Sequence, residues 1–226
     1  MAELNWGHSP QMPLRQFSEI CVQQSLLGFE WDKSAFGIDN LDRRVNKPQP
    51  FTLFFAIFPE HEHAKRLALA SQALRAEHHF EGRLITVDRL HVSLHSVGKF
   101  IDMVPRLVVD AAMAAAARVD CPQFTVVFDH VQSFPPSNAF VLIPDAKSDA
   151  AIARLRQLLA IALRKVSLHP QASRTAHMTM LYDKEHIAMH PIEGIEWKAT
   201  RFALILSHEG QTHHQWVGEW ALSEAF

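Results

Sequence analysis

Two five-residue segments of the 226-residue chain share one arrangement of side chains that could do acid–base chemistry. Residues 90–94 read LHVSL and residues 176–180 read AHMTM, so each places a histidine and a hydroxyl two positions apart among apolar residues. Alternate side chains of a strand share a face, so the imidazole and the hydroxyl project together while their apolar neighbours enter the core. When all three framing positions must be apolar, chance predicts roughly 0.15 matches in such a chain.

A pair of such motifs suits the cleavage of a phosphodiester. One neutral histidine can take a proton from the attacking water, while the other, protonated, gives one to the departing alkoxide. This chemistry contributes about 10²–10⁴-fold per group, enough for a strained cyclic phosphate without a metal. We therefore expect His91 and His177 to be catalytic and the hydroxyls of Ser93 and Thr179 to hold the phosphate oxygens. Which histidine is the acid and which the base is left open.

The paired motifs resemble the His-x-Thr/Ser signature of the two-histidine phosphoesterases. Within that superfamily they are most similar to the RNA 2′,3′-cyclic phosphodiesterases, also called 2′-5′ RNA ligases. Residues 89–98, RLHVSLHSVG, look like the first motif with its trailing glycine, and residues 176–181, AHMTML, look like the second. The resemblance covers about residues 51–222.

The resemblance implies a fold and an activity. Members have two lobes, with the motif strands lining a central cleft, and they open a 2′,3′-cyclic phosphate to a 2′-phosphomonoester. Some members also join 2′-5′ ends in the reverse reaction. The implied substrate is an RNA 3′ end or a small cyclic nucleotide. The chain departs from the family at three places: Ala176 stands where members often have proline, Tyr182 and Asp183 stand where a basic residue often follows, and His95 stands where a larger or aromatic residue is expected.

Three further side chains near the motifs could bind substrate. Lys99 and Arg174 could hold phosphate, although a solvated surface charge is the commoner role for such residues. Tyr182, the single tyrosine of the chain, follows the second motif closely and could stack on a base, with ordinary packing as the alternative. Phe54 and Phe58, on the first predicted strand, are expected in the core.

The elements that must position these residues are predicted as two strand–helix–strand units. The predicted elements are strand 51–58, helix 60–80, strands 83–87 and 90–97, helix 104–119, strand 124–134, strand 139–143, helix 147–168, strand 176–182 and closing strands 201–207 and 215–222. The repeated order predicts an α+β fold of two related lobes. The resemblance implies that the mostly antiparallel sheets of these lobes face a central cleft. Residues 1–50 are punctuated by proline and glycine and lack a lasting period, so we interpret them as an N-terminal extension of a two-lobed domain at 51–226.

Composition narrows the classes of function. A formal net charge of -2 provides no basic field for gripping long nucleic acid through many phosphates. The only cysteines, Cys21 and Cys121, cannot form a disulfide framework and fit a reducing compartment. No secretory signal and no apolar run of membrane-spanning length is present in the sequence. We expect a cytoplasmic protein without a membrane or an obligate protein partner.

Cofactor motifs are missing from the sequence, and two other classes of function remain open. Eight glycines form neither a phosphate-binding loop nor a dinucleotide fingerprint. His186 and His190 have the spacing of metal ligands on a helix, but Pro191 follows and no helix is evident, so we expect no metal and no cofactor. The first alternative is a non-catalytic module that binds RNA ends or nucleotides on the same scaffold. The second is a histidine-rich metal protein.

Overall fold

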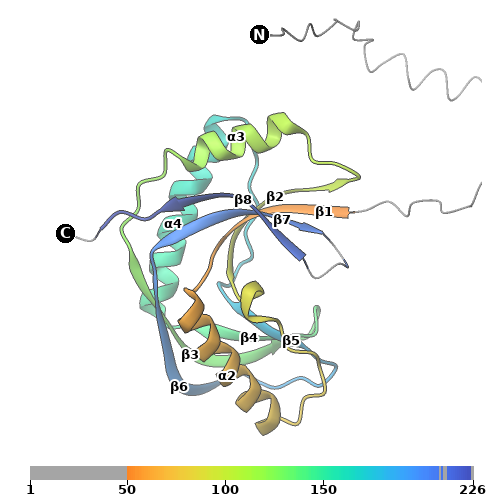
Figure 1. The fold of residues 1–226 in the computed structure, drawn as a ribbon. Helices are drawn as coiled ribbons and strands as arrows, with labels where there is room; N and C mark the ends of the chain where they lie inside the picture. The colour runs from red at the N-terminus through yellow and green to blue at the C-terminus, as the bar shows by residue number, and fades with distance from the viewer. Residues whose placement is uncertain (1–49, 209, 211–212, 225–226) are drawn as a thin grey trace, which may run out of the picture. The chain divides into compact units, whose positions relative to one another are not determined.

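A computed structural model describes residues 50–208, 210 and 213–224 of the chain, all within one unit, Asn46–Phe226. Except for Pro50, the N-terminal extension expected at residues 1–50 lies outside the described residues. Figure 1 shows the elements, which are β1 (Pro50–Ile57), α2 (His61–Glu77), η2 (Val87–Arg89), β2 (Val92–Ile101), α3 (Arg106–Ala116), β3 (Phe124–Phe134), β4 (Ala139–Pro144), α4 (Ala146–Lys165), β5 (Met178–Tyr182), β6 (His190–Ala199), β7 (Arg201–His208) and β8 (His213–Ala221).

The strands form an eight-stranded sheet in the order β6-β3-β4-β5-β2-β1-β7-β8, and every named pair in it is antiparallel. Its central strands, β2 and β5, are joined by a single ladder pair, Val92 opposite Met178. This weak junction divides the sheet into a first half (β2, β1, β7 and β8) and a second half (β6, β3, β4 and β5), which Figure 1 shows diverging from each other. The two predicted units are β1–α2–β2 and β4–α4–β5, and the predicted α+β class is confirmed.

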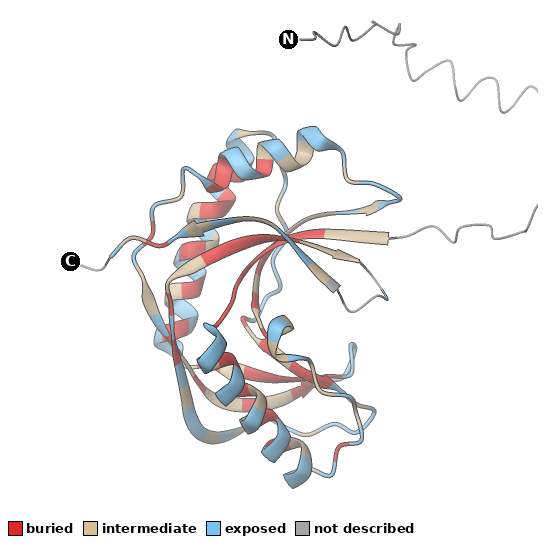
Figure 2. Ribbon diagram, in the orientation of Figure 1, coloured by how far each residue is buried: buried red, intermediate tan, exposed pale blue. Residues whose placement is uncertain are grey.

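The helices that the structure describes pack on one face of the sheet. The main core gathers one side of β1, namely Leu53, Phe55 and Ile57, with the apolar stripes of α2, α3 and α4. The intervening residues of β1 belong to a separate small cluster that contains no helical residue, made of Phe54, Ala56, Phe58, Ala203 and Ile205. We call the side of the sheet that carries this cluster the inner face. Figure 2 shows that the buried residues of the strands continue into the helices that pack on them.

The longest of the described helices, α4, contacts both halves of the sheet. It begins at Asp145, whose carboxylate caps it by accepting a hydrogen bond from the backbone N–H of Ser148 (2.7 Å). Ile152, Leu155 and Leu159 form its buried stripe, at the spacing that an amphipathic helix requires. The helix packs against β2, β3 and β4. Among the described helices, none combines the length and the apolar character needed to cross a membrane.

Two predictions about the elements are wrong in detail. The strand expected at 83–87 is an irregular segment that makes one isolated bridge, Leu84 to Leu181, before the short helix η2. The strand β6 was not predicted at all. It lies at the edge of the sheet and most of its residues reach solvent, with Trp197 and Ala199 buried, so its sequence lacks the apolar alternation of an inner strand.

Candidate active site

The first motif lies at the start of β2, directly after η2. The Nδ1–H of His91 donates to the carbonyl of Arg89 (2.6 Å), and its Nε2 lies 3.2 Å from the Oγ of Ser93. A carbonyl can only accept, so Nδ1 carries the proton and the Nε2 of the neutral ring has a lone pair. The hydroxyl of Ser93 therefore donates to Nε2. This arrangement leaves the imidazole ready to accept a proton at Nε2.

The second motif repeats the contact of Nδ1 with a carbonyl at the start of β5. The Nδ1–H of His177 donates to the carbonyl of Thr175 (2.9 Å), again two residues before the histidine. Its ring meets the edge of Phe134 at 5.0 Å between centroids. The same contact recurs between His190, the first residue of β6, and the carbonyl of Ala188 (3.1 Å), so it is a local consequence of extended backbone. What distinguishes the two motif histidines is therefore their place in the sheet.

The register of the junction brings the two motifs together. Val92 of β2 lies opposite Met178 of β5, and both side chains are fully buried in the main core. In an antiparallel pair, one step along each strand places His91 opposite Thr179 and Ser93 opposite His177. These four side chains lie on the inner face, because alternate residues point to opposite faces. The structure thus gathers the four residues expected from the motifs around one point.

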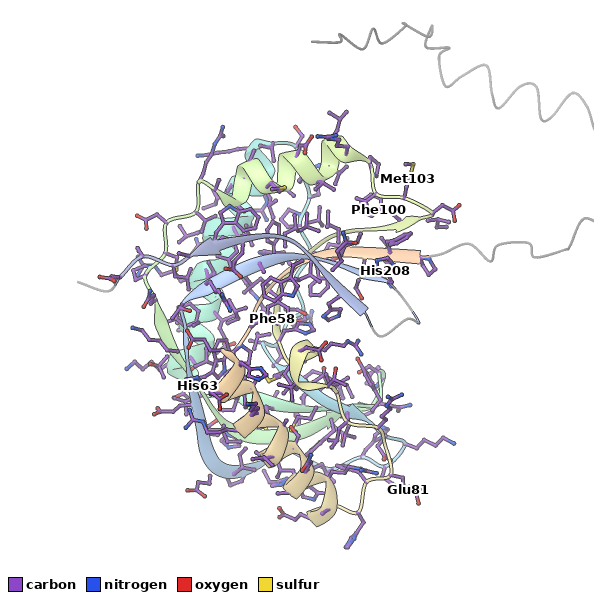
Figure 3. All side chains as sticks on the ribbon, in the orientation of Figure 1. Phe58, His63, Glu81, Phe100, Met103 and His208 are labelled. Carbon is purple, nitrogen blue, oxygen red and sulfur yellow. The ribbon has the colours of Figure 1, made fainter. Side chains whose placement is uncertain are left out.

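His91 lies in an aromatic enclosure on the inner face. The rings of Phe54, Phe58 and His214 surround it, with centroids at 5.3, 5.4 and 5.3 Å. Burial in these surroundings is the main cause that lowers the pKa of His91 to about 4, with smaller contributions from the charges of Arg89 and His177. Phe54 and Phe58 were expected in the core. They are buried, but in the small inner-face cluster against the imidazole, and Figure 3 labels Phe58 between the two halves of the sheet.

The pKa of His177 is lowered as well, for related reasons. Burial is the largest cause, and the positive charge of Arg156 adds to it, while the hydrogen bond to the Thr175 carbonyl works in the opposite direction. Both histidines of the free protein are thus neutral at pH 7. Their Nε2 atoms can accept protons, and either can become a donor once an anion nearby favours its charged form.

A pocket of about 400 Å³ opens on the inner face beside the first motif. Its lining includes His91, Ser93, Arg89, Lys99 and Tyr182. The pocket therefore combines an imidazole and a hydroxyl with two cationic side chains and an aromatic ring. Such a set of groups can bind a phosphate that carries a base.

The three further side chains that could bind substrate, Lys99, Arg174 and Tyr182, lie in different places. Lys99 and Tyr182 line this pocket, and Tyr182 is 54% exposed. A β-bulge between β4 and β5 brings Tyr182 to the same face as Thr179, because Thr179 pairs with Val141 and Tyr182 with Ala139. Arg174, by contrast, is exposed and does not belong to the lining of the pocket.

A second β-bulge explains the unusual histidine of the first motif. Ser93 pairs with Ala56 of β1, but His95 pairs with the adjacent Phe55, so β2 has one extra residue between them. His95 thereby turns away from the inner face and is 7% exposed. Its Nε2–H donates to the backbone carbonyl of Arg156 on α4 (2.8 Å). His95 is therefore a packing contact of α4.

Arg89 and Arg156 near the site were not found from the sequence. Arg89 lines the pocket and orients His91 through its carbonyl. Arg156 reaches the junction from α4 and donates to the carbonyl of Ser93 (2.6 Å). Arg89 stands at the start of the first-motif segment, two residues before His91, but was given no role, and Arg156 belongs to neither motif.

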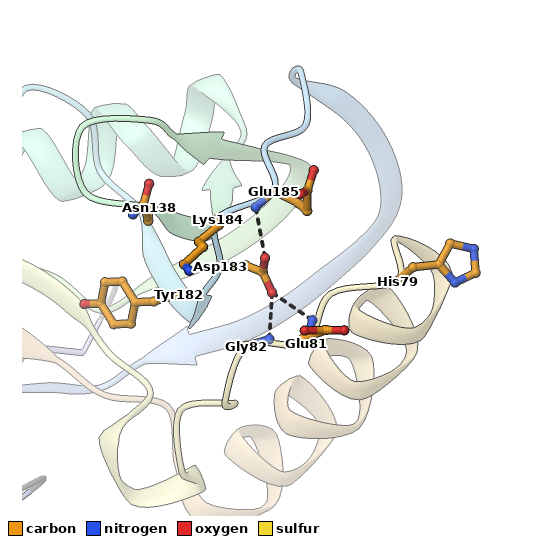
Figure 4. Close-up of a pocket in the computed structure, with 8 residues that line it drawn as sticks. All are labelled: His79, Glu81, Gly82, Asn138, Tyr182, Asp183, Lys184 and Glu185. Atoms are coloured by element: carbon orange, nitrogen blue, oxygen red, sulfur yellow. Dashed lines mark hydrogen bonds between the residues drawn. The ribbon is translucent and has the colours of Figure 1, made fainter.

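Asp183, which stands where a basic residue was expected, anchors a loop. Its carboxylate accepts hydrogen bonds from the backbone N–H groups of Glu81 (2.8 Å), Gly82 (2.6 Å) and Glu185 (2.9 Å), as Figure 4 shows. These bonds lower its pKa. A Cβ at Gly82 would collide with the carbonyl oxygen of Tyr182, so the contact requires glycine. Asp183 therefore fixes the segment that leads from α2 to η2 and His91.

The histidines considered as metal ligands are dispersed. The Nε2–H of His186 donates to the side-chain oxygen of Asn138 (2.9 Å), while His190 packs against His78 at 5.0 Å between centroids. Within the part of the chain that the structure describes, no three histidine, cysteine or acidic side chains are grouped as metal ligands.

Comparison with known proteins gives one family and one fold. The model of the 2′-5′ RNA ligase superfamily matches residues 59–211. No curated protein matches the chain. LigT of E. coli in complex with NADP+ is 24% identical with a TM-score of 0.61, and the match covers 78% of this chain and 99% of LigT. LigT in complex with 3′-AMP is 23% identical with the same TM-score, over 79% and 100% of the two chains. TT0787 of Thermus thermophilus is 19% identical with a TM-score of 0.61, over 77% and 100%.

Proposed function

The chain belongs to the 2′-5′ RNA ligase superfamily of two-histidine phosphoesterases, and from this premise we propose that it hydrolyses 2′,3′-cyclic phosphates at RNA ends or on small nucleotides. One observation carries the proposal. His91 and His177 stand on adjacent strands of the inner face, each opposite the hydroxyl residue of the other motif. A single phosphate between the strands can therefore meet two imidazoles and two hydroxyls.

The proposed reaction is an in-line attack of water on phosphorus. One imidazole takes a proton from the water as the new P–O bond forms, and the other gives a proton to the 3′ oxygen as the P–O3′ bond breaks. The product is a 2′-phosphomonoester with a free 3′-hydroxyl. The histidines finish with exchanged protonation states, and proton exchange with solvent restores them.

We assign the base to His91 and the acid to His177. The aromatic enclosure of His91 lowers its pKa to about 4, so its Nε2 remains unprotonated throughout the working pH range. The ring of His177 meets one aromatic side chain, Phe134, and faces the phosphate beside Ser93. The bound phosphate attracts a proton to His177 and offsets the effect of burial on its pKa.

Hydroxyls and cations complete the proposed phosphate site. Ser93 and Thr179 donate to the non-bridging oxygens as charge develops on them. In the free protein the Ser93 hydroxyl donates to the Nε2 of His91, so its rotation toward the phosphate also frees Nε2 for water. Arg89 and Lys99 supply positive charge at the pocket. Tyr182 offers an exposed ring on which a base can stack.

The pocket beside the first motif favours a short substrate. Its volume of about 400 Å³ lies at the lower end of the range for small-ligand pockets, and its lining does not include His177 or Thr179. The formal net charge of -2 does not favour long RNA. The crystals of E. coli LigT with NADP+ and with 3′-AMP support a nucleotide as the bound part of the substrate. Joining of 2′-5′ ends is the same chemistry run in reverse, and we expect it only when product ends are concentrated.

The proposal is tested by offering the protein a short RNA with a 2′,3′-cyclic phosphate and a panel of small cyclic nucleotides. We expect turnover to a 2′-phosphomonoester, identified by its resistance to a 3′-specific phosphatase. Binding of these compounds without turnover would instead establish the alternative, a non-catalytic module for nucleotides or RNA ends. If the protein neither binds nor hydrolyses these compounds, the proposed function and the alternative are both wrong.

A further inference from the structure

Arg156 lies at the junction of the two halves, where the ladder between β2 and β5 is incomplete. β2 meets β5 at Val92 and Met178, and it meets the preceding loop again at Ser96 and Gln171 through two backbone hydrogen bonds (2.7 and 3.0 Å). Between these points the two chains separate. The guanidinium of Arg156, in the middle of α4, occupies this gap.

The guanidinium contacts both sides of the gap. One terminal nitrogen, Nη2, donates to the carbonyl of Ser93 on β2 (2.6 Å). The other, Nη1, donates to the carbonyl of Ser173 in the loop before β5 (3.3 Å), and Nη2 also lies 3.5 Å from the Ser173 hydroxyl. The planar fork of an arginine suits such a bridge, because its donors have fixed relative directions.

From Ser173 the contacts lead to the second histidine. The hydroxyl of Ser173 donates to the carbonyl of Thr175 (2.8 Å), which is the group that accepts the Nδ1–H of His177. Arg156 is thus hydrogen-bonded directly to the backbone of one motif and, through Ser173, to the carbonyl that orients the histidine of the other motif. The Nε2–H of His95 donates to the backbone carbonyl of Arg156 (2.8 Å) and so helps to hold this part of α4 against β2.

No carboxylate within the described residues forms an ion pair with Arg156. Its charge is partly buried, and the carboxylate of Asp149 on the same helix favours the charged form of Arg156 without forming an ion pair with it. Arg156 from α4 is the charged group that acts on His177, and His177 in turn lowers the pKa of His91, just before β2. Arg156 therefore has a geometric effect on the site and an electrostatic one.

We propose that Arg156 is a positioning residue that sets the spacing and orientation of the two motifs by bridging the Ser93 carbonyl and the Ser173 loop. This inference rests on the proposed function, since its purpose is to hold two histidines on one phosphate. A lysine in its place would keep the charge but could not span both carbonyls with a fixed fork. A methionine would keep the length and lose both charge and donors.

The test compares Arg156→Lys and Arg156→Met with Arg154→Met, which removes an exposed charge from the same helix. We expect kcat on a 2′,3′-cyclic phosphate to fall about 10²-fold in both Arg156 variants with KM nearly unchanged, because displaced catalytic groups reduce the rate more than binding. Arg154→Met should match the wild type. Wild-type kcat in Arg156→Met, or a loss of kcat equal to the unfolded fraction, would overturn the proposal.

A readout independent of turnover separates this proposal from the proposed function. The pKa of His177, measured by NMR titration, should rise in Arg156→Met and remain near the wild-type value in Arg156→Lys. Amide exchange over residues 171–178 should accelerate in both. If the wild type hydrolyses no cyclic phosphate but these changes occur, the proposed function is wrong and the positioning role of Arg156 is supported. If the His177 pKa and the amide exchange do not change, Arg156 is not a positioning residue, whatever the activity of the variants.

Discussion

His91 and His177 each stand one residue before the single ladder pair of β2 and β5, Val92 opposite Met178. The two strands run antiparallel, so the histidines are related by a local two-fold axis through this pair, and each faces the hydroxyl residue of the other motif. In the proposed mechanism, this relationship presents two chemically similar groups to one phosphate from opposite sides. In-line displacement needs such an arrangement, because water enters opposite the departing oxygen.

The pH dependence should reveal unequal roles. If His91 is the base and His177 the acid, kcat/KM requires a neutral His91 and a protonated His177. The pKa of His91 is lowered to about 4 and that of His177 is also lowered from its ordinary value, so the optimum should lie between about pH 4 and 6.5. Above this range kcat/KM should fall about tenfold per pH unit. A plateau up to pH 9 would contradict the assignment.

Burial of His91 should also make the fold sensitive to acid. Its pKa is about 6.5 in an unfolded chain and about 4 in the folded protein, so the unfolded state binds more protons between these values. Stability should therefore decrease as the pH falls from about 6.5 to 4. The variant His91→Phe should lose less stability than the wild type over this range in urea titrations at several pH values. Equal losses would show that His91 is not the group responsible.

The hydroxyls can be tested with a matched pair at Thr179. Thr179→Val keeps the shape but removes the donor, and it should lower kcat about 10²-fold, a typical effect for one donor to a developing oxyanion. Thr179→Ser keeps the donor and should retain activity within a few-fold. Steady-state kinetics on the cyclic phosphate distinguish the two. Comparable activity in the valine and serine variants would remove the hydroxyl from the proposed mechanism.

Tyr182 should act on the base of the substrate. Loss of the ring in Tyr182→Ala should raise KM about 5–150-fold, because stacking contributes about 1–3 kcal/mol per base. Tyr182→Phe keeps the ring and should resemble the wild type. A substrate that carries the ribose cyclic phosphate without a base provides the control, since its KM should not respond to either change. An equal response of both substrates would point to a structural role for the ring.

Asp183 should stabilise the segment that leads to His91. Asp183→Ala leaves three backbone N–H groups without their acceptor, so the melting temperature should fall and proteases should cut more readily at residues 78–86. Lys184→Ala, at the adjacent exposed position, is the control. Limited proteolysis followed by mass spectrometry would locate the cuts. Unchanged protection of this segment would show that Asp183 does not anchor it.

The sequence predicted the parts of the site that follow from the alternation of apolar and polar residues along a strand. The apolar residues around His91 and His177 predicted strands whose histidine and hydroxyl share a face, and these strands are adjacent in the structure. The sequence did not predict the two bulges, which turn His95 toward α4 and Tyr182 toward the pocket, because a bulge depends on the partner strand. Arg156 was missed for a similar reason, since it is distant in sequence from both motifs that it contacts.

Phe54 shows where a correct pattern gave an incomplete interpretation. Its apolar run predicted burial, and the side chain is indeed buried. A continuous apolar strand does not reveal which of its two faces packs against helices and which lines a site. Only the pairing of β1 with β2 and β7 places Phe54 against His91 and away from the main core.

The most direct test of the two-histidine mechanism is hydrolysis of a short RNA ending in a 2′,3′-cyclic phosphate, run in excess EDTA with wild type, His91→Ala, His177→Ala and His190→Ala. His190 makes the same contact to a carbonyl two residues earlier but lies on the edge strand β6, so its variant should be fully active. We expect the wild type to yield a single 2′-phosphomonoester and each motif variant to lose about 10²–10⁴-fold in kcat while remaining folded. Full activity in folded His91→Ala or His177→Ala protein would contradict the mechanism.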